Sequence, residues 1–299
     1  MKIKLLTASV AAVLLAGCGS DSDPVVKTYA VQAYDPAVIG MKVEAVCGGE
    51  TYEAIELTTN YKGMVGQARF ENLAVVDSPD QCEFVLTHTD SSRDASNGKP
   101  ITTDYAIPQG LAQADGLVTG SPFTTLIAGS LGEGEIYSAD VAEKVFSDLG
   151  IDINAIGVSV DELLLNTEQV VQELQDQGDD DASAIATQLI ATANVVSDVI
   201  KANPDASPES VSVAAKAITE EVIAANPAYP LSETGDVIYV EIPAEDTQQV
   251  VGDVQDAIDA GTPVEDIKPD VPTIPDPEVG EPIEPEDPPG GGTGGTGGN

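Results

Sequence analysis

Strand-like and helix-like segments occupy separate parts of this chain, and that separation limits the folds available to it. Between residues 28 and 107, short runs rich in β-branched and aromatic residues are divided by turn signals such as Asp35-Pro36, Gly48-Gly49 and Asn97-Gly98. Between residues 138 and 226, apolar residues instead recur every three or four positions. Strands followed by helices predict an α+β fold.

Residues 28–108 are predicted to form an antiparallel β-sandwich. Six segments of this region combine strand-forming residues with partial alternation of polar and apolar positions: 28–34, 41–47, 52–58, 67–73, 82–88 and 101–107. Short strands separated by turns at this spacing are typical of sandwiches.

Residues 137–261 are predicted to form an α-helical bundle that also contains one strand. Four amphipathic helices are expected, beginning at Ser138 or Asp140, Ser159, Asp181 and Ser207. Short links between such helices favour a small bundle. A further helix is expected over 246–260, and the single strand candidate, 237–242, is expected at an edge, against the N-terminal sandwich.

Two other segments join and extend these parts. Residues 109–136 are expected to be a linker with a short helix, in which Ser121 supplies the N-cap and Pro122 the first helical position. Residues 262–299 are dominated by Pro, Asp, Glu and Gly. Because this composition is too polar for a core, we expect a disordered acidic Pro/Gly-rich tail, either solvated without a partner or acting as a spacer or groove ligand.

The charge of the chain excludes two kinds of partner. Twelve Lys and Arg residues face 51 Asp and Glu residues, which gives a formal net charge of −39. Nucleic-acid binding needs basic side chains that displace counterions, so no nucleic acid is expected as a partner. Electrostatic docking on anionic lipid is excluded for the same reason.

The first 18 residues have the pattern of an export signal. Lys2 and Lys4 precede an apolar run over 5–16 that is too short to span a bilayer as a permanent helix. We therefore expect residues 1–17 to be a signal peptide that is removed. Its end, Leu15-Ala16-Gly17-Cys18, resembles the lipobox of bacterial lipoproteins. The resemblance implies that Cys18 becomes the first mature residue and carries diacylglycerol and an N-acyl chain, with palmitate as the expected type.

The same resemblance implies a location. Lipoproteins kept in the inner membrane often have Asp directly after the Cys, whereas here Gly19 and Ser20 precede Asp21. We therefore expect a lipid-anchored protein of the outer membrane, on its periplasmic or surface face, with residues 18–27 as a tether. Each buried CH₂ contributes about 0.8 kcal/mol, so more than one chain makes such anchoring stable.

With Cys18 occupied by lipid, Cys47 and Cys82 remain. Two cysteines in an oxidising compartment most simply form a disulfide. The alternative is a redox or metal pair, but the chain has no C-x-x-C and its single histidine is His88.

The N-terminal region also resembles the β-sandwiches of the carboxypeptidase regulatory-like (transthyretin-like) group. The resemblance is carried by Gly40-Met41-Lys42-Val43-Glu44-Ala45, Thr58-Thr59-Asn60-Tyr61-Lys62-Gly63 and Ala68-Arg69-Phe70-Glu71-Asn72-Leu73. Modules of that group are usually non-catalytic, so the resemblance implies a structural or interaction role.

No catalytic residue, metal site or cofactor is predicted. Strings such as G-x-S-x-G, H-E-x-x-H and the phosphate-binding loop do not occur. His88 could act as a base, and Thr124 or Thr125 as a nucleophile, but no partner with a matching motif accompanies them. A packing or surface role is expected for His88, and a structural joint for the two threonines.

Calcium is the strongest ligand hypothesis. Asp90, Asp94, Ser96 and Asn97 share one loop, and residues 179–181 are three consecutive aspartates. Oxygen ligands at such spacing suit Ca²⁺, but neither segment matches an EF-hand. Solvated turns and a helix cap are the alternative interpretation.

Together these features predict a lipid-anchored cell-envelope protein with a non-catalytic structural or interaction role, whose unknown partner is a protein or a glycan. Two alternatives remain: a calcium- or glycan-binding surface adhesin component, and an envelope hydrolase using carboxylates. A cleft with two inward carboxylates, one of them desolvated, would favour the hydrolase.

Overall fold

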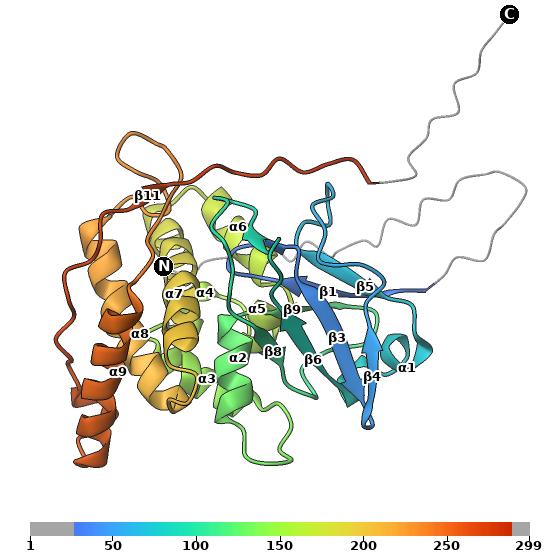
Figure 1. Cartoon of the computed structure of the whole chain (residues 1–299), viewed down its shortest axis with the longest axis horizontal. Helices are drawn as coiled ribbons and strands as arrows, with labels where there is room; N and C mark the ends of the chain where they lie inside the picture. The colour runs from blue at the N-terminus through green and yellow to red at the C-terminus, as the bar shows by residue number, and fades with distance from the viewer. Residues whose placement is uncertain (1–26, 289–299) are drawn as a thin grey trace, which may run out of the picture.

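Strands precede most of the helices in the computed structural model, which describes residues 27–288 (Figure 1). The predicted α+β class is confirmed, with the sheets in the N-terminal part and the helices after them. Residues 1–26, which include the predicted signal peptide and Cys18, lie outside the described residues, as do residues 289–299.

Four antiparallel strands form the larger sheet. They lie in the order β4 (Glu50–Glu53), β3 (Lys42–Cys47), β6 (Cys82–Thr87) and β8 (Tyr105–Ile107). Alternate residues are buried, Val43 and Ala45 on β3 and Phe84 and Leu86 on β6. This period of two directs one face of the sheet to the core and the other outward.

The smaller sheet packs against the larger one and completes a sandwich. It contains β5 (Gln67–Phe70), β1 (Tyr29–Ala33) and β9 (Leu117–Gly120) in that order. The ring of Phe84 in the larger sheet lies 6.0 Å from that of Tyr29 and 5.8 Å from that of Phe70. Aromatic contacts of this kind fill the space between the two sheets.

One strand of the sandwich departs from the sequence prediction. β9 lies in the predicted linker 109–136, and it pairs with β1 in parallel, so the sandwich is not wholly antiparallel. The connection after β8 carries the chain to the other sheet, where β9 joins the free edge of β1. Small elements complete this part: β2 (Val38–Ile39) paired with β7 (Arg93–Asp94), α1 (Leu73–Val76) and η1 (Pro79–Gln81).

The helices follow, grouped around one long central helix. They are α2 (Pro122–Ser130), α3 (Ala139–Asp148), α4 (Ile153–Ile156), α5 (Val160–Leu165), α6 (Thr167–Asp176), α7 (Asp180–Ala202), α8 (Pro208–Ala225) and α9 (Ala244–Asp259). α7 contacts α2, α6, α8 and α9. By length and hydropathy alone α7 could cross a membrane, but most of its apolar window is buried in the fold, which is typical of a core helix.

Two helix boundaries differ from the prediction. The helix expected from Ser159 is divided at Asn166, whose backbone (φ −136°, ψ 46°) is not helical. Asn competes for local backbone hydrogen bonds and so favours helix ends. The N-cap of α7 is Asp179, not Asp181, because its side chain accepts the backbone N–H of Ala182 at 2.8 Å.

The strand expected over 237–242 does not pair with the sandwich. Its core, β10 (Ile238–Tyr239), pairs antiparallel with β11 (Glu278–Val279), which belongs to the C-terminal segment. The prediction was wrong because that segment was read as tail, although it supplies the strand partner that β10 needs.

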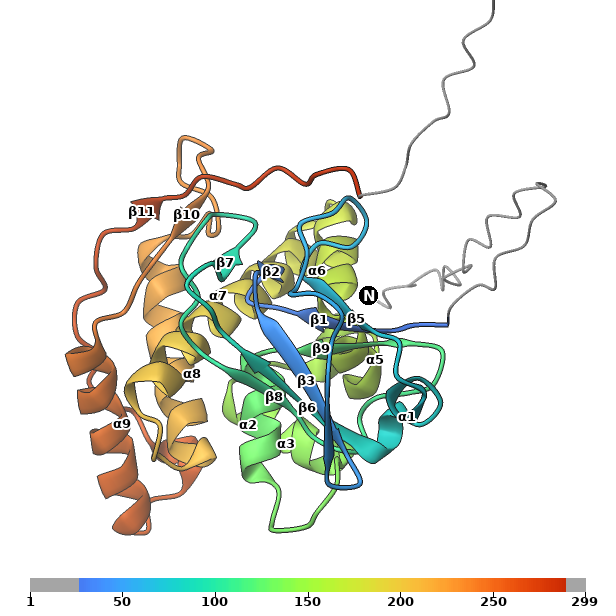
Figure 2. The ribbon, with the colours of Figure 1, turned by 45° about the vertical axis from the view of Figure 1, so that its right-hand side comes forward.

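The C-terminal segment is ordered over residues 262–288, contrary to the predicted tail from 262, and we call it the strap. It includes η2 (Val264–Asp266) and β11, and it crosses the helices and then the sandwich in extended form (Figures 1 and 2). Its backbone amides bond the body: Glu281 N–H to Asn97 O at 2.8 Å, Ile283 N–H to Ala95 O at 2.9 Å, and Glu286 N–H to Asn60 O at 2.8 Å.

Apolar residues within the acidic strap explain why it docks. Val264, Ile267, Val271 and Ile274 pack against the hydrophobic core, and they are spaced among the prolines and acids that dominate the composition. Proline favours an extended chain, and backbone carbonyl groups of the body accept hydrogen bonds from the extended strap. The composition predicted extension correctly but gave no indication of this partner surface.

Candidate functional site

The predicted cysteine pair forms a disulfide. Cys47 ends β3 and Cys82 begins β6, and the register places them directly opposite, with their Cα atoms 4.2 Å apart. The bond therefore joins neighbouring strands of the larger sheet and closes a chain separation of 35 residues. Cys18, the predicted lipidation residue, lies outside the described residues.

A buried set of polar side chains joins the sandwich to the helices, and we call it the polar seam. Its members are Asp35, Lys99, Tyr105, Asn194, Asp198 and Tyr229. Asp35 follows β1, and its carboxyl group accepts hydrogen bonds from the side chains of Asn194 and Tyr105, both at 2.8 Å. Tyr229 donates to the Asn194 carbonyl at 2.7 Å. Burial raises the pKa of Asp35 to about 7.

The second half of the polar seam is an ion pair. Lys99 Nζ lies 3.0 Å from Asp198 Oδ1, and the two side chains are only 5% and 9% exposed. The other carboxylate oxygen of Asp198 accepts the backbone N–H of Ile242 at 3.0 Å. Burial alone lowers the pKa of Lys99, but the nearby Asp198 and Asp35 outweigh it, and the net shift is upward. Lys99 is therefore charged at neutral pH.

The calcium hypothesis receives no geometric support from the described residues. Asp94 is fully buried, and its carboxyl group accepts the backbone N–H and the hydroxyl of Ser96 and the amide of Asn97, each at 2.7 Å. The loop thus uses its oxygens internally. Between residues 27 and 288, no group of three or more His, Cys, Asp or Glu residues is arranged to hold a metal ion. Of the aspartates 179–181, the first caps α7.

The other sequence candidates have structural partners. Thr124 completes a capping box with Ser121 at the start of α2. Thr125 donates to Ser121 O at 2.8 Å and accepts the Ala106 N–H at 3.0 Å, which ties α2 to β8. His88 Nδ1 lies 2.6 Å from an oxygen of Asp104 on the surface.

Desolvated carboxyl groups are present, but they are closed to substrate. Burial raises the pKa values of both Asp35 and Asp94 to about 7. Their exposed fractions are 1% and 0%, so nothing in solution reaches them in this conformation. They stand inside the fold, not in the cleft that a carboxylate hydrolase requires.

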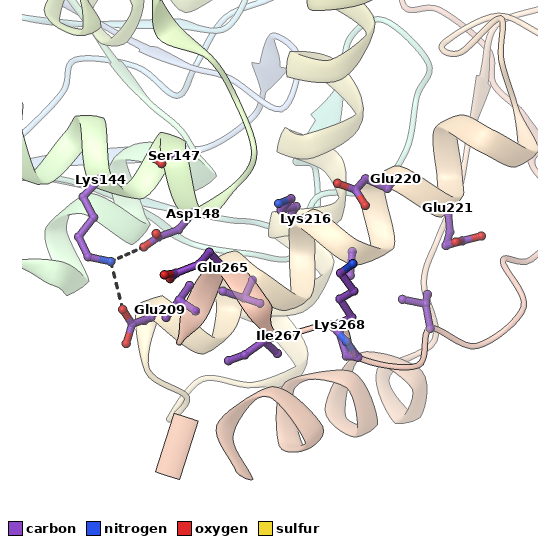
Figure 3. Close-up of a pocket in the computed structure, with 15 residues that line it drawn as sticks. Lys144, Ser147, Asp148, Glu209, Lys216, Glu220, Glu221, Glu265, Ile267 and Lys268 are labelled. Carbon is purple, nitrogen blue, oxygen red and sulfur yellow. Dashed lines mark hydrogen bonds and ion pairs between the residues drawn. The ribbon is translucent and has the colours of Figure 1, made fainter. Parts of the chain in front are cut away.

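Open cavities occur where the strap crosses the body. One, of about 860 Å³, lies between α3, α8 and the first part of the strap, and we call it the lysine groove. Figure 3 shows Lys144 reaching toward Asp148 and Glu209, at 2.6 and 3.1 Å. Lys216 and Lys268 also line it, among further glutamates, so the groove carries both signs of charge and no clear preference for an ion.

A second cavity, of about 560 Å³, lies under the last part of the strap. Its walls are the outward face of the smaller sheet, α6, and strap residues Ile283 and Pro285. We call it the amide pocket because five carboxamide side chains line it: Gln32, Gln67, Asn166, Gln169 and Gln172. No sequence motif marked these residues as a site. A weak signal was that Gln32 is the one polar side chain besides the tyrosine in the strand Tyr29–Ala33.

The fold and its cavities define an α+β protein whose disulfide-linked sandwich and helical part are joined by a buried polar seam and covered by an extended strap. Comparison of the chain with protein-family models, curated proteins and solved structures found no match.

Proposed function

We propose that this chain is a lipid-anchored protein of the bacterial outer membrane with a non-catalytic structural or interaction role. The observation that carries the proposal is the string Leu15-Ala16-Gly17-Cys18, which follows a basic start and a short apolar run. The described body begins at Lys27, a short stretch after Cys18, so the acylated cysteine would hold the body close to the membrane.

The disulfide supports export. Cys47 and Cys82 are paired within the sandwich, and disulfides persist in oxidising compartments such as the periplasm or the cell surface. The net charge of −39 keeps such a body soluble and away from anionic lipid, so a covalent anchor is needed to hold it at a membrane.

The interaction role is supported by the contrast between interior and surface. Asp35 and Asp94, whose pKa values are raised by burial, are sealed inside the fold, whereas the cavities open to solvent are lined by carboxamides, lysines and acidic side chains. This distribution suits binding better than acid–base catalysis by Asp35 or Asp94, because a catalytic acid or base must touch its substrate.

The test is membrane fractionation of cells that make the full chain or its Cys18→Ser variant. The proposal predicts that the full chain sediments with outer membranes on a density gradient. The variant should either keep its signal peptide or appear in the soluble fraction. A Cys18→Ala variant serves as a second version of the same test. A Cys18→Ser protein that is processed and still sediments with outer membranes as fully as the parent would contradict the anchor.

A further inference from the structure

The amide pocket has walls from three separate parts of the fold. Gln32 on β1 and Gln67 on β5 are register partners, so their side chains leave the smaller sheet side by side. Opposite them, α6 contributes Gln169 and Gln172, which lie three positions apart on one face of the helix, and Asn166 lines the pocket from the N-cap position just before it. The strap closes the third side. Side chains from rigid elements therefore converge on one cavity, which is the usual form of a small-ligand site.

Glu168 also lines the pocket, but one of its carboxyl oxygens is closed off from it. It lines the cavity from the first turn of α6, and its Oε2 is shielded from solvent without a hydrogen-bond partner among the described residues. Burial raises the pKa of Glu168, an effect that the Ala37 backbone N–H reduces. An oxygen that is shielded from solvent is also shielded from a ligand in the open cavity, so the hydrogen bonds to a ligand are left to the carboxamides.

The chemistry of the lining selects among ligand classes. Carboxamides both donate and accept hydrogen bonds, as hydroxyl groups do, and they carry no charge. An anion would be opposed by Glu173 and the net charge of the chain. A metal ion would need ionised ligands, but Glu173 already accepts a hydrogen bond from Gln169 at 2.8 Å and the environment of Glu168 disfavours its charged form.

The strap gives the pocket an apolar side. Ile283 and Pro285 line it, and they are held in place by the Ile283 N–H to Ala95 O bond and by the Asn60 side chain, which donates to Glu284 O at 2.8 Å. Leu117 adds apolar surface from β9. A cavity with hydrogen-bonding groups on two walls and aliphatic surface on the third matches a sugar ring, which presents hydroxyls at its edge and C–H groups on its faces.

We propose that the amide pocket binds a neutral sugar residue of a glycan, with the carboxamides of Gln67 and Gln172 as its hydrogen-bonding partners. This proposal rests on the interaction role proposed above but not on the lipid anchor. It names the glycan as the partner and places its site between α6, the smaller sheet and the strap, not on the loops of the sandwich.

The test uses the full chain purified in detergent and a panel of immobilised neutral oligosaccharides containing glucose, galactose or N-acetylglucosamine. A hit is then measured by titration calorimetry. Gln172 is exposed, so Gln172→Trp fills the pocket without disturbing the core, and it should weaken binding at least tenfold. The matched control is Gln175→Trp, on the same helix and exposed but outside the pocket, which should bind as the parent does.

Three results would overturn the glycan site. The first is that no neutral oligosaccharide of the panel binds, or that only charged glycans or peptides bind. The second is binding that Gln172→Trp leaves unchanged while thermal melting shows the variant folded. The third is binding that disappears in EDTA, because the proposed contacts involve no cation. Each result leaves the lipid anchor unaffected, since anchoring is read from membrane fractionation.

Discussion

Lys99 and Asp198 lie 3.0 Å apart in a buried ion pair that joins the loop before β8 to the central helix α7. They are 99 positions apart in the chain, and each comes from a different half of the molecule. Both residues belong to the polar seam, which joins the sandwich to the helices by hydrogen bonds and charge. Such a seam fixes one relative arrangement of the two parts, because its hydrogen bonds are satisfied in only one register.

Removing the cation of this pair should be strongly destabilising. Lys99→Met would leave the Asp198 carboxylate buried with the Ile242 N–H as its remaining donor, and the expected loss is about 3–5 kcal/mol in the free energy of unfolding. Urea denaturation of the single variant and of Lys99→Met with Asp198→Leu measures it. The double variant should recover much of the loss. Equal losses in both would show that the buried charge is not the cause.

The free energy of unfolding should decrease as the pH rises from about 4 to about 7, because two buried carboxyl groups lose their protons in this range. The pKa values of Asp35 and Asp94 are raised to about 7 in the folded protein, above the value of about 4 in an unfolded chain. The folded state therefore binds more protons in this range. The stabilising contribution of these groups to the free energy of unfolding is fully present below about pH 4 and is lost as the pH rises through about 7.

Denaturation at a series of pH values tests this dependence, with Asp35→Asn as the diagnostic variant. The variant cannot ionise at this position, so its stability should vary less between pH 4 and pH 7 than that of the parent. Asp140→Asn, at an exposed site in α3, is the matched control and should keep the parent slope. An Asp35→Asn profile parallel to the parent would show that Asp35 does not titrate in this range.

Loss of the disulfide should lower the free energy of unfolding by about 3–4 kcal/mol, because the bond reduces the conformational entropy of the unfolded chain. The bond spans 35 residues between Cys47 and Cys82. Comparing the oxidised protein with a Cys47→Ala, Cys82→Ala variant by urea denaturation measures the loss. A difference below about 1 kcal/mol would mean that the unfolded chain is already compact in this region.

The strap should come loose when its closest approach to the body is blocked. A Cβ atom on Gly280 would lie 2.6 Å from the backbone oxygen of Asn97, so Gly280→Ala forces the strap outward. The expected cost is about 1–3 kcal/mol, with faster cleavage of the strap by proteases. Gly252→Ala, where a Cβ meets open space in α9, is the control. Equal protease resistance in both variants would contradict a tightly docked strap.

The sequence predicted the elements whose signals are local. Ser121, Ser159 and Ser207 each cap a helix as expected, because the side chain of a cap residue bonds the backbone of the turn that follows it. Ser138, one of two predicted starts, precedes α3 without such a bond. The pairing of Cys47 with Cys82 was predicted by setting Cys18 aside as the lipidation residue, which left two cysteines, and the disulfide is present. In these cases the residues that determine the structure lie close together in the chain, or belong to a residue type that occurs only a few times in it.

The features that sequence reasoning missed depend on distant partners. β9 joins β1 in parallel because of where the chain crosses between sheets, and no local pattern encodes that edge. The strap has the composition of a disordered tail, and only the body supplies its hydrogen-bond partners. Asn194 and Asp198 in α7 belong to the polar seam because the sandwich faces them. The amide pocket likewise needs both the register of β1 and β5 and the position of α6.

The most direct test of the proposed anchor is the intact mass of the mature N-terminus, measured on protein extracted from membranes with detergent. The account predicts a chain that begins at Cys18, with the added mass of diacylglycerol and one further acyl chain, released in part by mild alkaline hydrolysis. A mature terminus at Cys18 without added acyl mass, or a chain that still begins at Met1 in outer membranes, would contradict it.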